Sequence, residues 1–379
     1  MASSWTGRRD AQALQPRPRR ARGTVAWLHR WLGLTVGLVL AVQGTTGALL
    51  AFRPELQVAM APAYVLADAA RLPLADVVAH AERDAAPGQA LRFIAWESSD
   101  GAYEVRYGGE GGDATWLVDP ATGERVARPW GDAAFWTIER VHRTFALGDA
   151  GHWITFAAAI ALLALVALGI VLRLPIRETL SRWLSPRSPA AGLPRWRRLH
   201  AVAGTWLLPL FLVTALTGLF WASDAYRNLL LKLAGQPPRP PRPAVMAPPA
   251  RPLPALERAL TTFAATAPDA KRVVFQVPRD AQAGIELRYL APDAPHDRAF
   301  GVVRLTIDGA LVAHEPFAAQ PAGKRALAYV YPLHSGSWLG IPGRALMMLS
   351  AATMPALFAI GLYLWLGARR RRRGLRAEA

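Results

Sequence analysis

The chain has 379 residues, of which 52% are hydrophobic and 19% charged, a composition too hydrophobic for a disordered protein. It contains no cysteine, which excludes disulfides, thiolate zinc sites, Cys-ligated iron–sulfur clusters, cysteine nucleophiles and covalently attached haem. The formal net charge is +17, but the arginines gather beside hydrophobic runs, as topology signals do. We therefore expect a lipid bilayer, and no nucleic acid, as a partner.

Four hydrophobic runs contain no Asp, Glu, Lys or Arg. Each is long enough to cross a hydrocarbon core, which needs about 20 residues. The sequence therefore predicts four membrane-spanning helices, containing residues 31–52, 153–172, 201–223 and 345–368. The first run is too long for a cleaved signal peptide, so we interpret it as a retained span. Arginines cluster before span one, between spans two and three and after span four, which places both termini in the cytoplasm.

Each extracytoplasmic segment shows a short helical pattern followed by strand patterns of period two. The predicted helices and strands are 74–85, 91–96, 102–107 and 115–118 in the first segment, and 253–265, 272–277, 285–290 and 301–307 in the second. One helix on a small antiparallel sheet is expected in each. The glycine-dense stretch 108–112 joins two strands and is predicted to be a hairpin turn, not a dinucleotide-binding loop.

The predicted fold class is a membrane α-helical protein with four transmembrane helices in a twofold internal repeat and two small extracytoplasmic α+β domains. The segments are a basic cytoplasmic N-terminus (1–26), span one (27–52), domain one (53–140), an outer histidine segment with span two (141–172), a basic cytoplasmic loop (173–198), span three (199–223), a Pro-rich tether with domain two (224–332), a second outer histidine segment with span four (333–368) and a basic cytoplasmic tail (369–379). The Pro-rich stretch 236–254 is expected to be stiff.

The two halves of the chain are copies of one unit. Residues 27–47 align without a gap on residues 198–218. The matching pairs are Leu28 with Leu199, His29 with His200, Gly33 with Gly204, Thr46 with Thr217, Gly47 with Gly218, and, at the entries to spans two and four, His142 with His334, Gly148 with Gly340, and Gly151 with Gly343. Each half is therefore a span, an extracytoplasmic segment and a second span.

Two duplicated histidine pairs are the candidate functional residues. His29 and His200 begin spans one and three at the cytoplasmic surface, and His142 and His334 lie at the other surface. Ionisable residues at membrane spans are costly and mark functional sites. Two neutral imidazoles that face one another inside a helix bundle are the ligands of a six-coordinate haem b. The sequence therefore predicts two non-covalent bis-His sites for haem b.

The outer ligands leave an alternative open. A continuous helix would hold His142 and His334 roughly 15 Å outside the membrane, so the glycines that follow them must let each segment fold back. His152 starts span two and could replace His142 as a ligand, bind a haem propionate, or face the interface. The remaining histidines have no counterpart in the other half and are expected to be surface residues: His80, His296 and His314.

Polar and small residues inside spans one and three have two interpretations. Small residues permit close helix packing or give room to a porphyrin face, and packing alone accounts for most such residues. Gln43, in the middle of span one, could donate a hydrogen bond across the bundle. The residues concerned are Gly44, Thr45, Thr46, Gly47, Thr217 and Gly218.

Short motifs along the chain resemble those of the PepSY-associated transmembrane family. They are Leu28-His29-Arg30-Trp31-Leu32-Gly33 with Thr46-Gly47, Val141-His142-Arg143 with Leu147-Gly148, Leu199-His200 with Leu216-Thr217-Gly218, and Pro332-Leu333-His334-Ser335-Gly336 with Pro342-Gly343-Arg344. The resemblance covers about residues 23–370 and includes bacterial inner-membrane ferric-siderophore reductases and other iron-regulated membrane proteins. His152 departs from the family pattern, which has Arg there, so it leaves the outer ligation open.

The resemblance implies a multi-pass protein of the bacterial inner membrane with PepSY-like domains and b-type haem on the duplicated histidines. It implies an oxidoreductase that passes electrons from the cytoplasmic or quinone side to the periplasm. Its expected substrate is a ferric siderophore or other ferric chelate, reduced for iron release and uptake. The expected electron donor is a quinol or a cytoplasmic reductase.

Two other classes of function compete with this one. A non-redox PepSY membrane protein with regulatory or binding modules would carry no chromophore. A transporter would use the internal repeat and histidines for proton coupling, but the four runs have no charged residue in mid-span.

Overall fold

The computed structural model describes residues 18–97, 101–109, 113–174, 178–238, 255–278 and 284–377. Three predictions concern residues outside these ranges: most of the basic N-terminus, the centre of the glycine turn and most of the Pro-rich tether. The chain divides into two compact units. The helical unit comprises 1–42, 160–212 and 353–379, and the sheet unit comprises 43–159 and 213–352.

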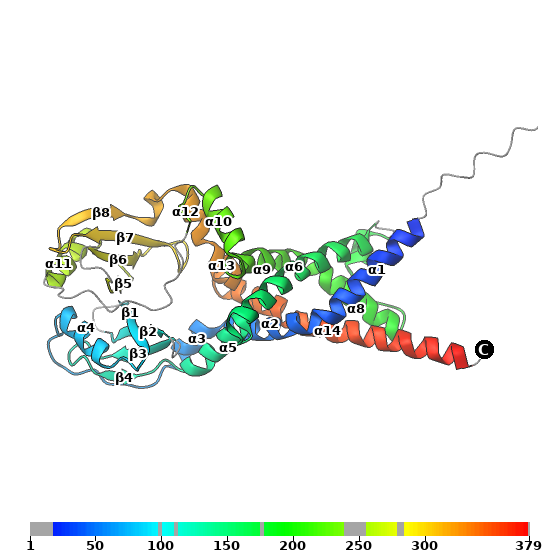
Figure 1. Ribbon diagram of the computed structural model, residues 1–379, viewed down its shortest axis with the longest axis horizontal. Coiled ribbons are helices and arrows are strands. Elements are labelled where there is room, and N and C mark those ends of the chain that lie inside the picture. The colour runs from blue at the N-terminus through cyan, green and yellow to red at the C-terminus, as the bar shows by residue number, and fades with distance from the viewer. Residues whose placement is uncertain are drawn as a thin grey trace, which may run out of the picture. The chain divides into compact units, whose positions relative to one another are not determined.

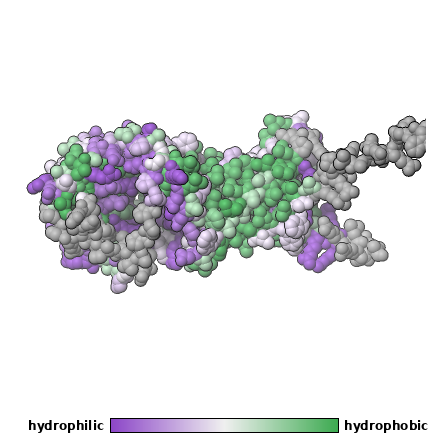
Figure 2. Space-filling view, turned by 45° about the horizontal axis from the view of Figure 1, so that its top comes forward, coloured by the Kyte–Doolittle hydropathy of each residue, from purple (hydrophilic) through white to green (hydrophobic). Residues whose placement is uncertain are grey.

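Two long helices are apolar enough to cross a membrane, α6 (Gly148–Arg173) and the part of α14 (Gly340–Ala377) within Ser337–Arg371. Two further helix pairs pass the same test but are bent, by 57° between α1 (Pro18–Thr35) and α2 (Gly37–Leu50) and by 58° between α8 (Leu193–Trp206) and α9 (Leu208–Ala222). The described residues thus hold two candidate spans, or four if each bent pair is one span. Hydrophobic residues cover the surface of these helices (Figure 2), as contact with lipid requires.

Both bends fall at the same place in the repeat, at Val36 and at Leu207. In the second copy Pro209 follows the break, and proline has no N–H to donate to the carbonyl one turn earlier. In the first copy Gly37 follows the break, and a Cβ there would come within 2.5 Å of Phe358 on α14. The two copies therefore reach one backbone shape through different residues.

The sheet unit contains one eight-stranded antiparallel sheet (Figure 1), with strand order β4-β3-β2-β1-β5-β6-β7-β8. Its strands are β1 (Gln89–Trp96), β2 (Tyr103–Gly109), β3 (Ala114–Val118), β4 (Arg125–Ala127), β5 (Arg272–Gln276), β6 (Ile285–Leu290), β7 (Phe300–Leu305) and β8 (Leu311–Glu315). The predicted strands are present, and each half adds a fourth strand, β4 or β8, that the sequence pattern missed.

The two halves join where β1 pairs with β5, from Phe93 opposite Gln276 to Trp96 opposite Val273. The helices α4 (Leu74–Arg83) and α11 (Leu256–Thr266) contact one another, and the Glu257 carboxylate accepts a hydrogen bond of 2.7 Å from Leu74 N. One hydrophobic core includes Ile94 and Phe275, both fully buried. The expectation of two separate small domains is therefore corrected to two halves of one sheet, because pairing removes an open edge from each half.

The sheet unit also contains several short helices that follow or precede its strands along the chain (Figure 1). They are α3 (Arg53–Ala59), α5 (Asp132–Thr144), α10 (Asp224–Leu233), α12 (Ala322–Ala328) and α13 (Val330–Ser335). After α5 the chain reverses through Phe145, Ala146 and Gly148, which all have positive φ. After α13 it reverses through Gly336 and Gly340, with φ of 80° and 62°. These reversals turn both outer histidine segments back along the helices that follow.

Candidate functional site

The outer histidines face one another within the sheet unit. The ring centroids of His142, on α5, and His334, on α13, are 6.3 Å apart, with 60° between the ring planes. His152 lies on α6, and no contact among the described residues joins it to this pair. The structure thus places His142, and not His152, opposite His334.

Each outer imidazole is held by the same contact in both copies of the repeat. Nδ1 of His142 lies 3.0 Å from Thr46 Oγ1, and Nδ1 of His334 lies 2.9 Å from Thr217 Oγ1. Nδ1 of His142 also donates to the Gln43 carbonyl at 3.1 Å. His334 makes the equivalent bond to the backbone of Thr214, which aligns with Gln43.

These bonds fix the tautomer of both rings. The backbone carbonyls of Gln43 and Thr214 can only accept, so the Nδ1 that bonds to each of them is the donor, and the threonine hydroxyl beside it can accept from the same N–H. The proton therefore sits on Nδ1, and Nε2 keeps the lone pair that a metal requires.

Glycines leave room for these rings. A Cβ at Gly47 would lie 3.1 Å from Cε1 of His142, and a Cβ at Gly218 would lie 3.5 Å from Cε1 of His334. The Thr-Gly pairs of spans one and three are therefore support for the histidines, beyond simple helix packing. Gln43 also contacts His142, because its side-chain amide donates to the His142 carbonyl at 3.5 Å.

The inner histidines face one another within the helical unit. The ring centroids of His29, on α1, and His200, on α8, are 6.2 Å apart, and the rings are perpendicular. Nδ1 of both rings is buried and lacks a partner of normal hydrogen-bond geometry among the described residues. The backbone groups that interact with these rings are those of Leu165 on α6 and Leu357 on α14, which occupy matching positions in the two copies.

Glycines lie one turn from the residues of the inner site. A Cβ at Gly204, one turn after His200, or at Gly361, one turn after Leu357, would meet no atom within 4 Å. In the other copy, Cβ atoms at Gly33 and Gly169 would be 3.8 Å from Leu165 and from His29 Cε1. The four glycines, at matching positions in the two copies, therefore have room for at least a Cβ, and Gly169 lies directly beside His29.

The centroid distances of both pairs would suit two imidazoles that hold one metal ion between them. Two imidazoles that each make a metal–nitrogen bond of about 2 Å hold their ring centroids about 6 Å apart. Among the described residues there is no group of three or more His, Cys, Asp or Glu that could hold a metal ion by itself. Two imidazoles without further ligands suit a metal that brings its own equatorial ligands, and iron protoporphyrin is such a group.

Several residues around the outer pair were not predicted from the sequence. Trp221 packs on His334 with a centroid distance of 5.4 Å, and Tyr331 follows at 6.4 Å from Trp221. Arg344 aligns with His152 and is buried, with Nε 2.8 Å from Glu55 and Nη1 3.1 Å from the Ala51 carbonyl. At each of these three positions the aligned residue of the other copy is of a different type, so comparison of the two halves could not identify them.

One histidine differs from its prediction as a surface residue. His296 is only 6% exposed, and its ring packs on Tyr329 with a centroid distance of 4.2 Å. The aromatic residues that bury His296 come from the segment after β8. The sequence around His296 itself gives no sign of this contact. His314 is exposed, as expected, and its Nε2 shares a 2.7 Å hydrogen bond with the Tyr289 hydroxyl.

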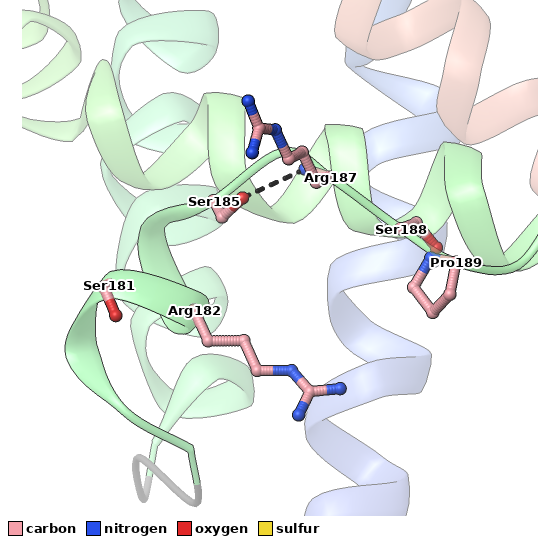
Figure 3. Close-up of a pocket in the computed structure, with 6 residues that line it drawn as sticks. All are labelled: Ser181, Arg182, Ser185, Arg187, Ser188 and Pro189. Atoms are coloured by element: carbon pink, nitrogen blue, oxygen red, sulfur yellow. Dashed lines mark hydrogen bonds between the residues drawn. The ribbon is translucent and has the colours of Figure 1, made fainter.

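Among the described residues, two hollows in the helical unit have linings without a histidine. One, of about 580 Å³, lies on the basic loop around α7 (Leu180–Leu184) and is lined by Ser181, Arg182, Ser185, Arg187, Ser188 and Pro189. Figure 3 shows the Arg182 and Arg187 side chains pointing away from one another across this loop. The other, of about 560 Å³, is an apolar groove lined by α1 and α6.

Comparisons with known proteins identify the class of the chain. The sequence model of the PepSY-associated TM region matches residues 26–368. The chain is also similar to "Uncharacterized protein PA4219" of Pseudomonas aeruginosa, with 30% identity over 246 residues. That match covers 60% of this chain and 61% of the relative. The family match and the apolar helices together show a membrane protein.

Proposed function

The chain belongs to the PepSY-associated transmembrane family, and we propose that it is a b-type dihaem protein that passes electrons across a bacterial inner membrane. In this proposal it reduces a ferric chelate, such as a ferric siderophore, on the periplasmic side. The observation that carries the proposal is the presence of two histidine pairs with centroid distances of 6.2 and 6.3 Å, each supported alike in both copies of the repeat.

The orientation follows from charge. The basic loop between α6 and α8 and the arginines at the end of α14 belong to the helical unit, as do His29 and His200. Arg22 donates to the carbonyls of Leu172 and Leu174 at the end of α6, so basic residues gather at these helix ends. The positive-inside rule places this end, both termini and the inner pair on the cytoplasmic side. The sheet unit with the outer pair is then periplasmic.

Haem, when bound, supplies a metal that changes its charge by one electron. The chain's own residues do the rest: the histidines would hold the iron, the hydroxyls of Thr46 and Thr217 keep the outer rings in the ligating tautomer, and the glycines make room. The apolar helices exclude water from both pairs, and burial and second-shell bonds set the reduction potential.

The overall reaction balances simply. One electron converts Fe(III) in the chelate to Fe(II), for which hard oxygen donors are poorer ligands, so the iron is released. A quinol donor would supply two electrons and two protons, and so reduce two ferric chelates. A cytoplasmic reductase would enter at the same inner pair.

The direct test is anaerobic reduction of ferric citrate by the purified protein after stoichiometric reduction with dithionite. The expected result is one Fe(II), trapped by a chromogenic ferrous chelator, for each electron stored. A protein that stores no electrons, or stores them without forming Fe(II), would contradict the proposal.

The hydroxyls of Thr46 and Thr217 are expected to strengthen haem binding at the outer pair. Replacing Thr46 and Thr217 together by valine removes both hydroxyl contacts to Nδ1 while keeping the side-chain shape. We expect haem affinity at the outer pair to fall about 10–100-fold, the usual cost of losing a second-shell partner. Haem titration of the apoprotein measures this, and Thr205→Val, in the helical unit, is the matched control. Equal affinities in the double variant and the wild type would refute the role of the hydroxyls.

A further inference from the structure

Two arginines of the sheet unit lie near each other without a counter-ion. Arg288 is on β6, and Arg298 is in the loop between β6 and β7. The guanidinium of Arg288 lies over the Phe300 ring at 4.6 Å, and that of Arg298 lies over the Tyr331 ring at 4.2 Å. Among the described residues, neither guanidinium has a carboxylate within salt-bridge distance. Burial lowers the pKa of Arg288; the Glu286 charge opposes this, and the Arg298 charge adds to it.

The carboxylates of Glu286, Glu315 and Asp297 are bound to other groups, and Asp293, in the same loop as Arg298, is exposed and, within the described ranges, forms no ion pair with either arginine. Glu286 and Glu315 pair with Arg304, at 3.4 and 2.9 Å. Asp297 accepts a 2.9 Å hydrogen bond from Ser337 and lies 3.8 Å from Arg344. Positive charge is therefore in excess at Arg288 and Arg298. Arg288 is half-buried and Arg298 is exposed. Because a half-buried cation without a partner is costly, Arg288 favours binding of an external anion, and the charge of Arg298 adds to the attraction.

Aromatic rings connect this positive surface to the outer histidines. Tyr331 is 37% exposed, so a docked molecule can reach it. Its ring lies 6.4 Å from Trp221, and the Trp221 ring lies 5.4 Å from His334. Guanidinium groups recognise carboxylate and phenolate oxygens, and aromatic rings pack against flat ligands.

We propose that Arg288, Arg298 and Tyr331 form a docking site for an anionic ferric chelate with carboxylate or catecholate oxygens. Trp221 then lies between the docked chelate and His334. This inference rests on the proposed function for the identity of the ligand, but the docking site itself binds without any electron transfer.

The test uses gallium(III), which matches ferric iron in charge and coordination but is not reduced by biological donors. Binding of Ga(III)–citrate to the full purified chain is measured by calorimetry. We expect Arg288→Gln with Arg298→Gln to weaken binding by about tenfold for each guanidinium lost. Arg83→Gln, which removes the same charge from an exposed position on α4, is expected to change binding less than threefold. A Ga(III)–trihydroxamate complex without negative charge is expected to bind weakly to all variants.

Unchanged Ga(III)–citrate binding in the double variant, or no binding to the wild type, would overturn the docking site. Arg288→Lys guards against misfolding, because it keeps the charge and is expected to retain most of the affinity. If the gallium complex binds as predicted while ferric citrate is not reduced, the docking site stands and the reductase proposal fails. If the double variant binds Ga(III)–citrate as tightly as the wild type while ferric citrate is reduced normally, the docking site fails and the reductase proposal stands.

Discussion

Replacing His142 and His334 together by alanine is expected to leave one haem per chain and to lower ferric-chelate reduction by at least about 100-fold. The outer pair would lose both iron ligands, whereas His29 and His200 belong to the helical unit and share no ligand with it. In the proposed dihaem protein, electrons would then have no carrier near the docked chelate. Pyridine haemochrome analysis counts the haems, and ferrous-chelate absorbance measures the reduction.

His314→Ala is the matched control for this variant. His314 lies in the sheet unit, is exposed and has no counterpart in the repeat, so both haems and the full rate are expected to remain. Two haems in the His142→Ala, His334→Ala protein would show that the outer ligands are other residues. His152→Ala tests the remaining alternative, and we expect it to keep both haems.

Replacing Arg344 by alanine is expected to give the largest loss of stability. Its side chain is 9% exposed and joins α14 to Glu55 on α3, the Ala51 carbonyl and the loop that carries Asp297. Removing one partner of a buried ion pair leaves the other uncompensated, which costs about 3–5 kcal/mol. Because Glu55 is partly exposed, we expect a decrease of about 3 kcal/mol in the free energy of unfolding. Denaturant unfolding in detergent measures it.

Arg227→Ala is the comparison for Arg344→Ala. Arg227 pairs at 2.6 Å with Asp224, whose carboxylate is 76% exposed, and an ion pair of that kind contributes about 1 kcal/mol or less. Equal stability losses in the two variants would contradict the structural role assigned to Arg344.

The repeat made the histidine sites predictable from sequence. His29 and His200 align without a gap, as do the Thr-Gly pairs, and residues that align in a duplicated bundle occupy matching depths. Period-two patterns also located most strands, since polar and apolar residues alternate there. The position of each bend was not predicted, because Pro209 marks it in one copy and Gly37 in the other.

The features that could not be predicted from the sequence depend on contacts between segments that are far apart in the chain. The pairing of β1 with β5 depends on two strands in different halves, and no local pattern selects it. His296 is buried by Tyr329, which lies on a later segment. The roles of Thr46 and Thr217 required the folded position of His142 and His334, because a threonine inside a span is equally suited to helix packing.

In the proposed dihaem protein, each histidine pair holds one haem. The most direct test of this claim is an oxidised and dithionite-reduced absorption spectrum of the purified full-length protein, with pyridine haemochrome quantitation. We expect low-spin b-type spectra and about two haems per chain, with one lost in His29→Ala, His200→Ala and the other in His142→Ala, His334→Ala. A colourless protein after haem supplementation during expression would contradict the claim and favour a non-redox regulatory or binding protein.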